Sequence, residues 1–172
     1  MIKTLISEEQ LYQRITEVAD ELNRHYAYIL KENEPLIVIC VLKGAMPFCA
    51  ELIKHLALPV QLECVSLSSY INNVSTGKVN AHICLPDVGN KQVLVVEDII
   101  DTGITLSYFK DYLENLMAKV TIVTLLNKQD TRRVKIEPDY YCFNIDNKYV
   151  VGFGLDDNQL LRNLNYIGYK EI

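Results

Sequence analysis

The chain has 172 residues, 49% of them hydrophobic, which favours one domain over residues 1–172 with a full apolar core. Its 17 basic and 22 acidic side chains give a net charge of −5, so it lacks the basic surplus with which proteins neutralise nucleic-acid phosphates. The N-terminus has no signal-peptide h-region, and no apolar run approaches the ~20 residues of a membrane span. The five cysteines form no CxxC pair, so we expect a cytoplasmic protein with reduced thiols, and Cys40 and Cys64 are expected in the core.

The elements of the N-terminal half follow from apolar spacing and turn residues. Ser7 to Gln10 have the form of a capping box, and apolar residues at helical spacing continue this helix to near Lys31. The pattern then predicts a buried strand at 36–42, a helix at 45–56, a strand at 60–69, an exposed loop at 69–78 and a strand at 79–85. The strands around residues 60–85 are typical of a hairpin arm.

The C-terminal half predicts strands at 93–96, 119–126, 139–145, 149–153 and 166–169, with a helix at 104–117. Continuous apolar strands that alternate with helices indicate an α/β protein with a parallel twisted sheet flanked by helices. Ligands of such sheets bind at the carboxyl ends of the strands. Candidate residues follow four apolar runs, namely Lys43-Gly44, Glu97 to Thr105, Lys128 and Asp156.

The stretch VLVVEDIIDTGITL, residues 93–106, carries the most specific chemistry. A tight strand-to-helix turn presents successive backbone N–H groups, and the helix N-terminus adds positive dipole character. Hydroxyl groups of the turn add donors, and its glycine allows close approach or positive φ. We therefore expect a cup for one phosphate group, built from Asp101, Thr102, Gly103, Ile104 and Thr105.

Two carboxylates, Glu97 and Asp98, lie at the mouth of the same strand. They repel a phosphate, but they can accept hydrogen bonds from a sugar diol or hold Mg²⁺ through water. A ribose 5-phosphate satisfies both demands, because its phosphate fits the cup while its 2- and 3-hydroxyls reach the carboxylates. The alternative is an ordinary acidic turn in which Asp101 caps the helix.

The order of strand, Glu-Asp, two apolar residues and Asp-Thr-Gly resembles the phosphoribosyl-pyrophosphate (PRPP) motif of the type I phosphoribosyltransferases. Over residues 36–169 the chain resembles the hypoxanthine-guanine phosphoribosyltransferases, in the purine branch of that family. Five segments carry the resemblance: VLKGA (41–45), SSYINNVSTG (68–77), the PRPP motif, LLNK (125–128) and KYVVGFGLDDNQLLRNL (148–164).

The resemblance implies the type I phosphoribosyltransferase fold, with a flap hairpin and a small hood region. It implies a general acid/base at Asp101, near purine N7, and a catalytic flap with Ser69 and Tyr70. Pyrophosphate would contact Lys43, Gly44 and Arg162, with a cis peptide bond before Lys43. The purine would contact Lys128, Tyr149, Val150 and Asp156, and Mg²⁺ would be held at Glu97, Asp98 and Asp156.

The reaction that the resemblance implies is purine salvage. A 6-oxopurine, hypoxanthine or guanine, would react with PRPP to give a nucleoside monophosphate and pyrophosphate, with Mg²⁺ as cofactor. Assembly into a homodimer or homotetramer is implied as well. The sequence leaves the preference among hypoxanthine, guanine and xanthine open.

Taken singly, several of these residues have plainer interpretations. Tyr149 is typical of a core residue and Lys128 of a solvated one. Arg132 and Arg133 are typical of a solvated loop pair, although Arg132 could approach the pyrophosphate region. The functional interpretation depends on five segments that occur together and in the right order at strand ends.

Two rival hypotheses remain from the residues. One is a PRPP-sensing regulator that keeps the fold and binds nucleic acid, since a fold alone does not prove activity. The acidic charge, and the expectation that no DNA-binding unit precedes the first helix, speak against it. The other is a transferase for another base, such as xanthine or a pyrimidine, and the segment from Tyr149 to Asp156 favours 6-oxopurines over pyrimidines.

Overall fold

Five parallel strands form the central sheet of the computed structural model, which describes residues 1–67 and 85–170. Their order across the sheet is β3-β2-β4-β5-β6, and every neighbouring pair is parallel. The strands are β2 (Leu36–Val41), β3 (Val60–Val65), β4 (Gln92–Ile100), β5 (Lys119–Asn127) and β6 (Tyr140–Asn144). The prediction of a parallel sheet flanked by helices is therefore confirmed.

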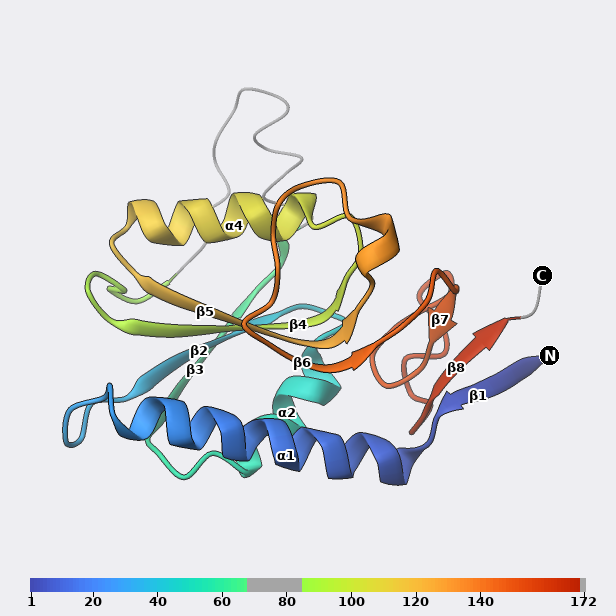
Figure 1. The fold of residues 1–172 in the computed structure, drawn as a ribbon, viewed down its shortest axis with the longest axis horizontal. Coiled ribbons are helices and arrows are strands. Elements are labelled where there is room, and N and C mark those ends of the chain that lie inside the picture. Colours follow the sequence, from blue (N-terminus) through green and yellow to red (C-terminus); the bar gives the residue numbers. More distant parts are fainter. Residues whose placement is uncertain (68–84, 171–172) are drawn as a thin grey trace.

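Helices cover both faces of this sheet (Figure 1). The helices α1 (Glu8–Ala27) and α2 (Met46–Lys54) lie on one face, and α4 (Ile104–Asn115) lies on the other. The predicted capping box is present, because Gln10 N donates to Ser7 Oγ at 3.2 Å and Ser7 N donates to Gln10 Oε1 at 2.9 Å. The helix ends at Ala27, earlier than the predicted end near Lys31.

A smaller three-stranded sheet forms the hood region beside the carboxyl ends of the main strands. Its order is β1-β8-β7, with β1 (Ile2–Ile6), β7 (Val150–Val151) and β8 (Ile167–Lys170) all antiparallel to their neighbours. We did not predict β1. Its five residues are mostly exposed or half-buried, and its partner strand lies at the other end of the chain, so local pattern gives little signal.

The strand β3 corrects one prediction about the arm. We expected residues 60–69 to belong to a hairpin arm, but β3 pairs in parallel with β2 at the edge of the main sheet. Because an edge strand presents alternate residues to solvent, Cys64 is exposed, whereas Cys40 in the central strand β2 is buried as expected. The predicted flap and most of the strand at 79–85 lie outside the described residues.

The other helices and strands begin and end within a few residues of the ranges predicted from the sequence. The main difference is β4, which extends to Ile100 and so carries Glu97 and Asp98 within the strand. Among the described residues, no helix is long and apolar enough to cross a bilayer. One domain over residues 1–172 stays a prediction.

The hood packs on the main sheet through two glycines. Gly154 has φ +100°, and a Cβ built on it would lie 2.0 Å from the carbonyl oxygen of Gly44, in the loop after β2. The contact leaves no room for a side chain and holds the hood loop against the loop that follows β2.

The variant Gly154→Ala is expected to lower the free energy of unfolding by more than 1 kcal/mol, since alanine is strained at positive φ and its Cβ collides with backbone. Urea denaturation measures the change. Gly89→Ala is the matched control, because Gly89 is not at positive φ and a Cβ there approaches a side-chain oxygen no closer than 3.3 Å. Equal stability of Gly154→Ala and the parent would contradict the contact.

Candidate active site

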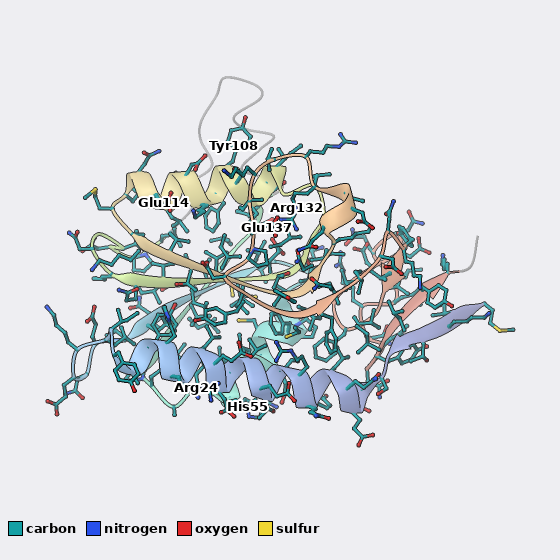
Figure 2. The ribbon with its side chains drawn as sticks, viewed as in Figure 1. Arg24, His55, Tyr108, Glu114, Arg132 and Glu137 are labelled. Carbon is teal, nitrogen blue, oxygen red and sulfur yellow. The ribbon has the colours of Figure 1, made fainter. Side chains whose placement is uncertain are left out.

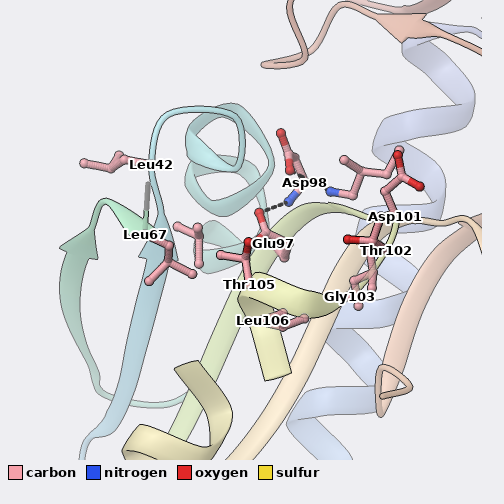
Figure 3. Close-up of a pocket in the computed structure, with 12 residues that line it drawn as sticks. Leu42, Leu67, Glu97, Asp98, Asp101, Thr102, Gly103, Thr105 and Leu106 are labelled. Carbon is pink, nitrogen blue, oxygen red and sulfur yellow. Dashed lines mark hydrogen bonds between the residues drawn. The ribbon is translucent and has the colours of Figure 1, made fainter. Parts of the chain in front are cut away.

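The carboxyl ends of β2 and β4 enclose a cavity of about 310 Å³ (Figure 3). Its walls come from the end of β2, the end of β4 and the turn into α4. The lining residues are Val41, Leu42, Leu67, Glu97, Asp98, Ile99, Ile100, Asp101, Thr102, Gly103, Thr105 and Leu106. From Glu97 to Leu106, every residue of the predicted PRPP motif except Ile104 thus lines one cavity.

The turn at one side of this cavity has the form of an anion cup. Gly103 is the N-cap of α4 and adopts the left-handed conformation, with φ +79°. In the described part of the chain no side chain caps this helix, so the alternative in which Asp101 serves as its N-cap is wrong. The first N–H groups of α4 are left for a ligand, and an anion is the ligand that a helix N-terminus favours.

The carboxylates of Glu97 and Asp98 lie side by side at the end of β4 (Figure 3). Glu97 Oε1 accepts a hydrogen bond from Asp98 N at 3.0 Å, and Asp98 Oδ1 accepts one from Ile99 N at 2.7 Å. Burial, and then the charge of Asp98, raise the pKa of Glu97 well above its ordinary value. Burial also raises the pKa of Asp98, although its hydrogen bonds and the charge of Arg162 oppose this rise.

The donor set at these carboxylates fits Mg²⁺ in one particular way. Among the described residues, no cluster of three acidic, cysteine or histidine side chains could hold a metal ion by itself. Mg²⁺ is commonly held by one or two carboxylates, with substrate oxygens and water as the other ligands. Glu97 and Asp98 supply the first part of such a site.

Two of the predicted pyrophosphate residues, Gly44 and Arg162, approach Asp98. The peptide bond between Leu42 and Lys43 is cis, as the resemblance implied, and Lys43 is exposed. Gly44 lies so close that a Cβ there would be 1.6 Å from Asp98 Oδ2. From the hood, Arg162 donates to Gly154 O at 2.7 Å, and its charge acts on Asp98.

Asp156 is engaged within the hood. Its Oδ1 pairs with Arg162 Nη2 at 2.8 Å, and its Oδ2 accepts a hydrogen bond from Gln159 N at 2.8 Å. The structure therefore brings Asp156 and Arg162 together beside the carboxylates of β4. A metal ion at Asp156 would compete with these two partners.

Of the predicted base-binding residues, Lys128 lies next to Asp101, whereas Tyr149 contacts the hood loop. Lys128 is only 7% exposed, and its Nζ lies 3.6 Å from Asp101 Oδ2, so the interpretation of Lys128 as a solvated side chain is wrong. Tyr149 is 53% exposed, so its interpretation as a core residue is wrong too. Its hydroxyl lies 3.3 Å from both Asp156 O and Asp157 Oδ1, and Val150 is buried in β7 beside it.

Two residues of the site were missed or misjudged. The side chain of Arg132 is 9% exposed and lies behind the phosphate cup, neither solvated nor directed at the pyrophosphate residues. Asn127, which precedes Lys128, accepts a hydrogen bond from Arg132 Nη2 at 2.7 Å. A polar residue at the end of a buried strand was the available signal for Asn127. Ser69 and Tyr70 lie outside the described residues.

The sequence matches the model of the phosphoribosyl transferase domain over residues 2–158. The chain belongs to the phosphoribosyltransferase family. It is 42% identical to the hypoxanthine-guanine phosphoribosyltransferase of Lactococcus lactis over 168 residues, which are 96% of this chain and 89% of the relative.

Solved structures of the family agree with this assignment. The hypoxanthine-guanine phosphoribosyltransferase of Bacillus anthracis superposes with a TM-score of 0.86 at 39% identity, covering 99% of this chain and all of that one. The hypoxanthine phosphoribosyltransferase of Trypanosoma cruzi, in complex with the product IMP, superposes with a TM-score of 0.85 at 32% identity, covering 97% of this chain and 89% of that one. The type I phosphoribosyltransferase fold is thus confirmed.

The variant Glu97→Gln is expected to gain stability over the parent phosphoribosyltransferase as pH rises. Between the ordinary and the raised pKa of Glu97, the folded parent holds more protons than the unfolded chain, so its stability falls with rising pH. The variant lacks this titration. Thermal unfolding between about pH 4 and 8 measures the difference, and each 1 kcal/mol shifts Tm by about 2–4 °C.

Exposed Glu32 supplies the control for this experiment, because Glu32→Gln removes a carboxylate outside the site. Its Tm over the same pH range gives the baseline for loss of a carboxylate outside the site. A Tm difference between Glu97→Gln and the parent that does not change with pH would refute the raised pKa.

Proposed function

We propose that the protein transfers the 5-phosphoribosyl group from PRPP to N9 of a 6-oxopurine, hypoxanthine, guanine or both, and releases pyrophosphate. The observation that carries the proposal is the pair formed by Lys128 and Asp101 at 3.6 Å. It joins a buried ammonium group, suited to a purine 6-oxo oxygen, to the first residue of the phosphate cup. Relatives named for this reaction cover nearly the whole chain.

The ribosyl phosphate would lie across the cavity. Its phosphate would bind the N–H groups of residues 102–105 at the N-terminus of α4, and hydroxyls of Thr102 and Thr105 would add hydrogen bonds. Its 2- and 3-hydroxyls would donate to Glu97 and Asp98. This arrangement places the uncharged sugar between the negative phosphate and the negative carboxylates.

Pyrophosphate is a leaving group of high negative charge, so its departure needs stabilisation by cations and hydrogen-bond donors. Lys43 and Arg162 would supply positive charge, and the backbone at Gly44 would supply a donor. Mg²⁺, when bound at Glu97 and Asp98, would neutralise the developing charge on the pyrophosphate oxygens. A second Mg²⁺ at Asp156 would require Arg162 to release its carboxylate.

The base would stack on the exposed ring of Tyr149, with its 6-oxo group toward Lys128 and its edge at the backbone of Val150. Asp101 would face N7 and exchange a proton with the base as the bond from N9 to C1′ forms and the bond from C1′ to pyrophosphate breaks. The half-exposed carboxylate of Asp101 can reach a bound base from the cup. The flap with Ser69 and Tyr70 would exclude water from the ribosyl cation.

A steady-state assay tests this proposal directly. PRPP and Mg²⁺ are offered with hypoxanthine, guanine, xanthine and adenine in separate reactions, and nucleotide formation is followed by absorbance. Turnover with a 6-oxopurine, none with adenine, and loss of turnover on chelation of Mg²⁺ are expected. Binding of PRPP without turnover of any base would favour the regulator instead. A cytoplasmic location and a homodimer or homotetramer stay predictions.

Asp101→Asn is expected to lower kcat by about 10²–10⁴-fold, the usual contribution of acid/base catalysis, while PRPP binding changes little. The amide keeps the shape of the side chain and loses the proton-accepting carboxylate. Single-turnover kinetics and equilibrium PRPP binding separate the two effects. Asp130→Asn removes the charge of an exposed carboxylate in the turn after β5 and should leave kcat unchanged. An unchanged kcat in Asp101→Asn removes this residue as the acid/base.

Tyr149→Ala is expected to weaken nucleoside monophosphate binding by about 1–3 kcal/mol, the scale of base stacking on an aromatic ring. Tyr149→Phe is the matched control, because it keeps the ring and removes only the hydroxyl contacts to Asp156 and Asp157. Isothermal titration calorimetry measures both affinities. If the alanine variant binds as tightly as the phenylalanine variant, the base stacks elsewhere.

A further inference from the structure

The guanidinium group of Arg132 lies behind the phosphate cup and is almost saturated with acceptors. Nε donates to Asp101 O at 3.1 Å, and Nη2 donates to Asn127 Oδ1 at 2.7 Å and to Ile100 O at 3.4 Å. Nη1 donates to Ile136 O. The side chain is 9% exposed, although nothing in its position after Lys128 in the sequence indicates burial.

Its neighbours in the segment 128–133 bind the same turn. Lys128 N donates to Ile100 O at 3.1 Å, and Arg133 N donates to Thr102 O at 3.0 Å. With the bond from Arg132 to Asp101 O, three successive carbonyl groups at residues 100–102 are all held by this one segment. The carbonyl groups therefore point away from the cavity and into the protein.

This arrangement fixes the direction of the N–H groups. In a trans peptide the N–H of one residue points opposite to the C=O of the residue before it. Holding the carbonyls of residues 100–102 thus turns the N–H groups of residues 101–103 to the opposite side. The same three residues, Asp101, Thr102 and Gly103, line the cavity.

The aliphatic part of the Arg132 side chain also packs closely against Gly103 in the turn. A Cβ built on Gly103 would lie 2.9 Å from Arg132 Cδ and 2.5 Å from Ile136 Cγ2, so the turn is seated directly on these two side chains. The ion pair with Glu137, at 3.7 Å, involves a carboxylate that is 63% exposed. Figure 2 shows Arg132 and Glu137 beside each other near one end of α4. Water screens the exposed Glu137, and the buried guanidinium charge is left to favour an anion in the cup.

We propose that Arg132 is a positioning residue, which holds the carbonyls of Ile100 and Asp101 so that the turn after β4 binds the 5-phosphate of the substrate. It acts through the backbone and does not touch the ligand. The inference rests on the proposed function for the identity of the phosphate.

The test compares a ligand with its phosphate-free counterpart. Dissociation constants of inosine 5′-monophosphate and of inosine are measured by calorimetry for the parent, Arg132→Gln and Arg132→Lys. The ratio of the two constants isolates what the phosphate contributes. Arg132→Gln is expected to weaken binding of the monophosphate at least tenfold and that of inosine less than twofold.

Arg132→Lys separates geometry from charge, because lysine keeps the charge but has no planar fork to bind several carbonyls. For this variant we expect the dissociation constant of inosine divided by that of inosine 5′-monophosphate to fall at least fivefold. We also expect the KM for PRPP to rise more than the KM for the base. The control is Lys135→Gln, which removes a positive charge from an exposed site in the same loop and should leave the ratio unchanged.

Every outcome of these binding measurements either supports or overturns the positioning role of Arg132. A folded Arg132→Gln or Arg132→Lys variant with the ratio of the parent overturns the inference and leaves the proposed function intact. A parent that binds both ligands equally overturns the proposed function, and the inference with it. If Arg132→Gln does not fold, Arg132→Lys carries the test, and failure of that variant to fold as well would assign Arg132 to fold stability and overturn the positioning role.

Discussion

Repulsion between like charges at the end of β4 is the constraint on which the site depends. Glu97 and Asp98 are adjacent, half-buried carboxylates, and they line the same cavity as a turn built for an anion. Burial raises the pKa of both carboxyl groups, and the charge of Asp98 raises the pKa of Glu97 further. The proposed sugar phosphate and divalent cation would relieve this repulsion, because hydroxyls and positive charge would meet the carboxylates while the phosphate would bind in the cup.

The rest of the fold holds the carboxylate pair and the phosphate-binding turn in place. Parallel pairing of β2, β4 and β5 brings their carboxyl ends to one edge of the sheet. The segment after β5 fixes the back of the cup, and the hood reaches the loop after β2 through the contact of Gly154 with Gly44. From the hood, the charge of Arg162 reaches Asp98, so the carboxylate pair is partly balanced even in the free protein.

Patterns of short range predicted most of the fold, and the discrepancies have physical causes. The buried strands and the helix at 104 were evident because apolar runs and the Thr-Gly turn are local signals. The strand β1 and the parallel pairing of β3 depend on partners distant in the sequence, which no local pattern identifies. Lys128 is buried and Tyr149 exposed, contrary to their residue types, because Lys128 pairs with Asp101 and Tyr149 contacts the polar hood loop. Arg132 gave no signal at all, since its acceptors, three backbone carbonyls and the side chain of Asn127, are brought together only by folding.

The number of protons exchanged on ligand binding tests most directly whether the ligand changes the protonation of Glu97 and Asp98. PRPP with Mg²⁺ is titrated into the protein at mildly acidic pH, in buffers of different ionisation enthalpy, and the number of protons exchanged is obtained from the heats. The account predicts that binding releases protons from the carboxylate pair, and that the release falls in Glu97→Gln after the ligand's own titration is subtracted. Binding with equal proton exchange in the parent and in Glu97→Gln would contradict it, because the ligand would then leave these carboxylates unchanged.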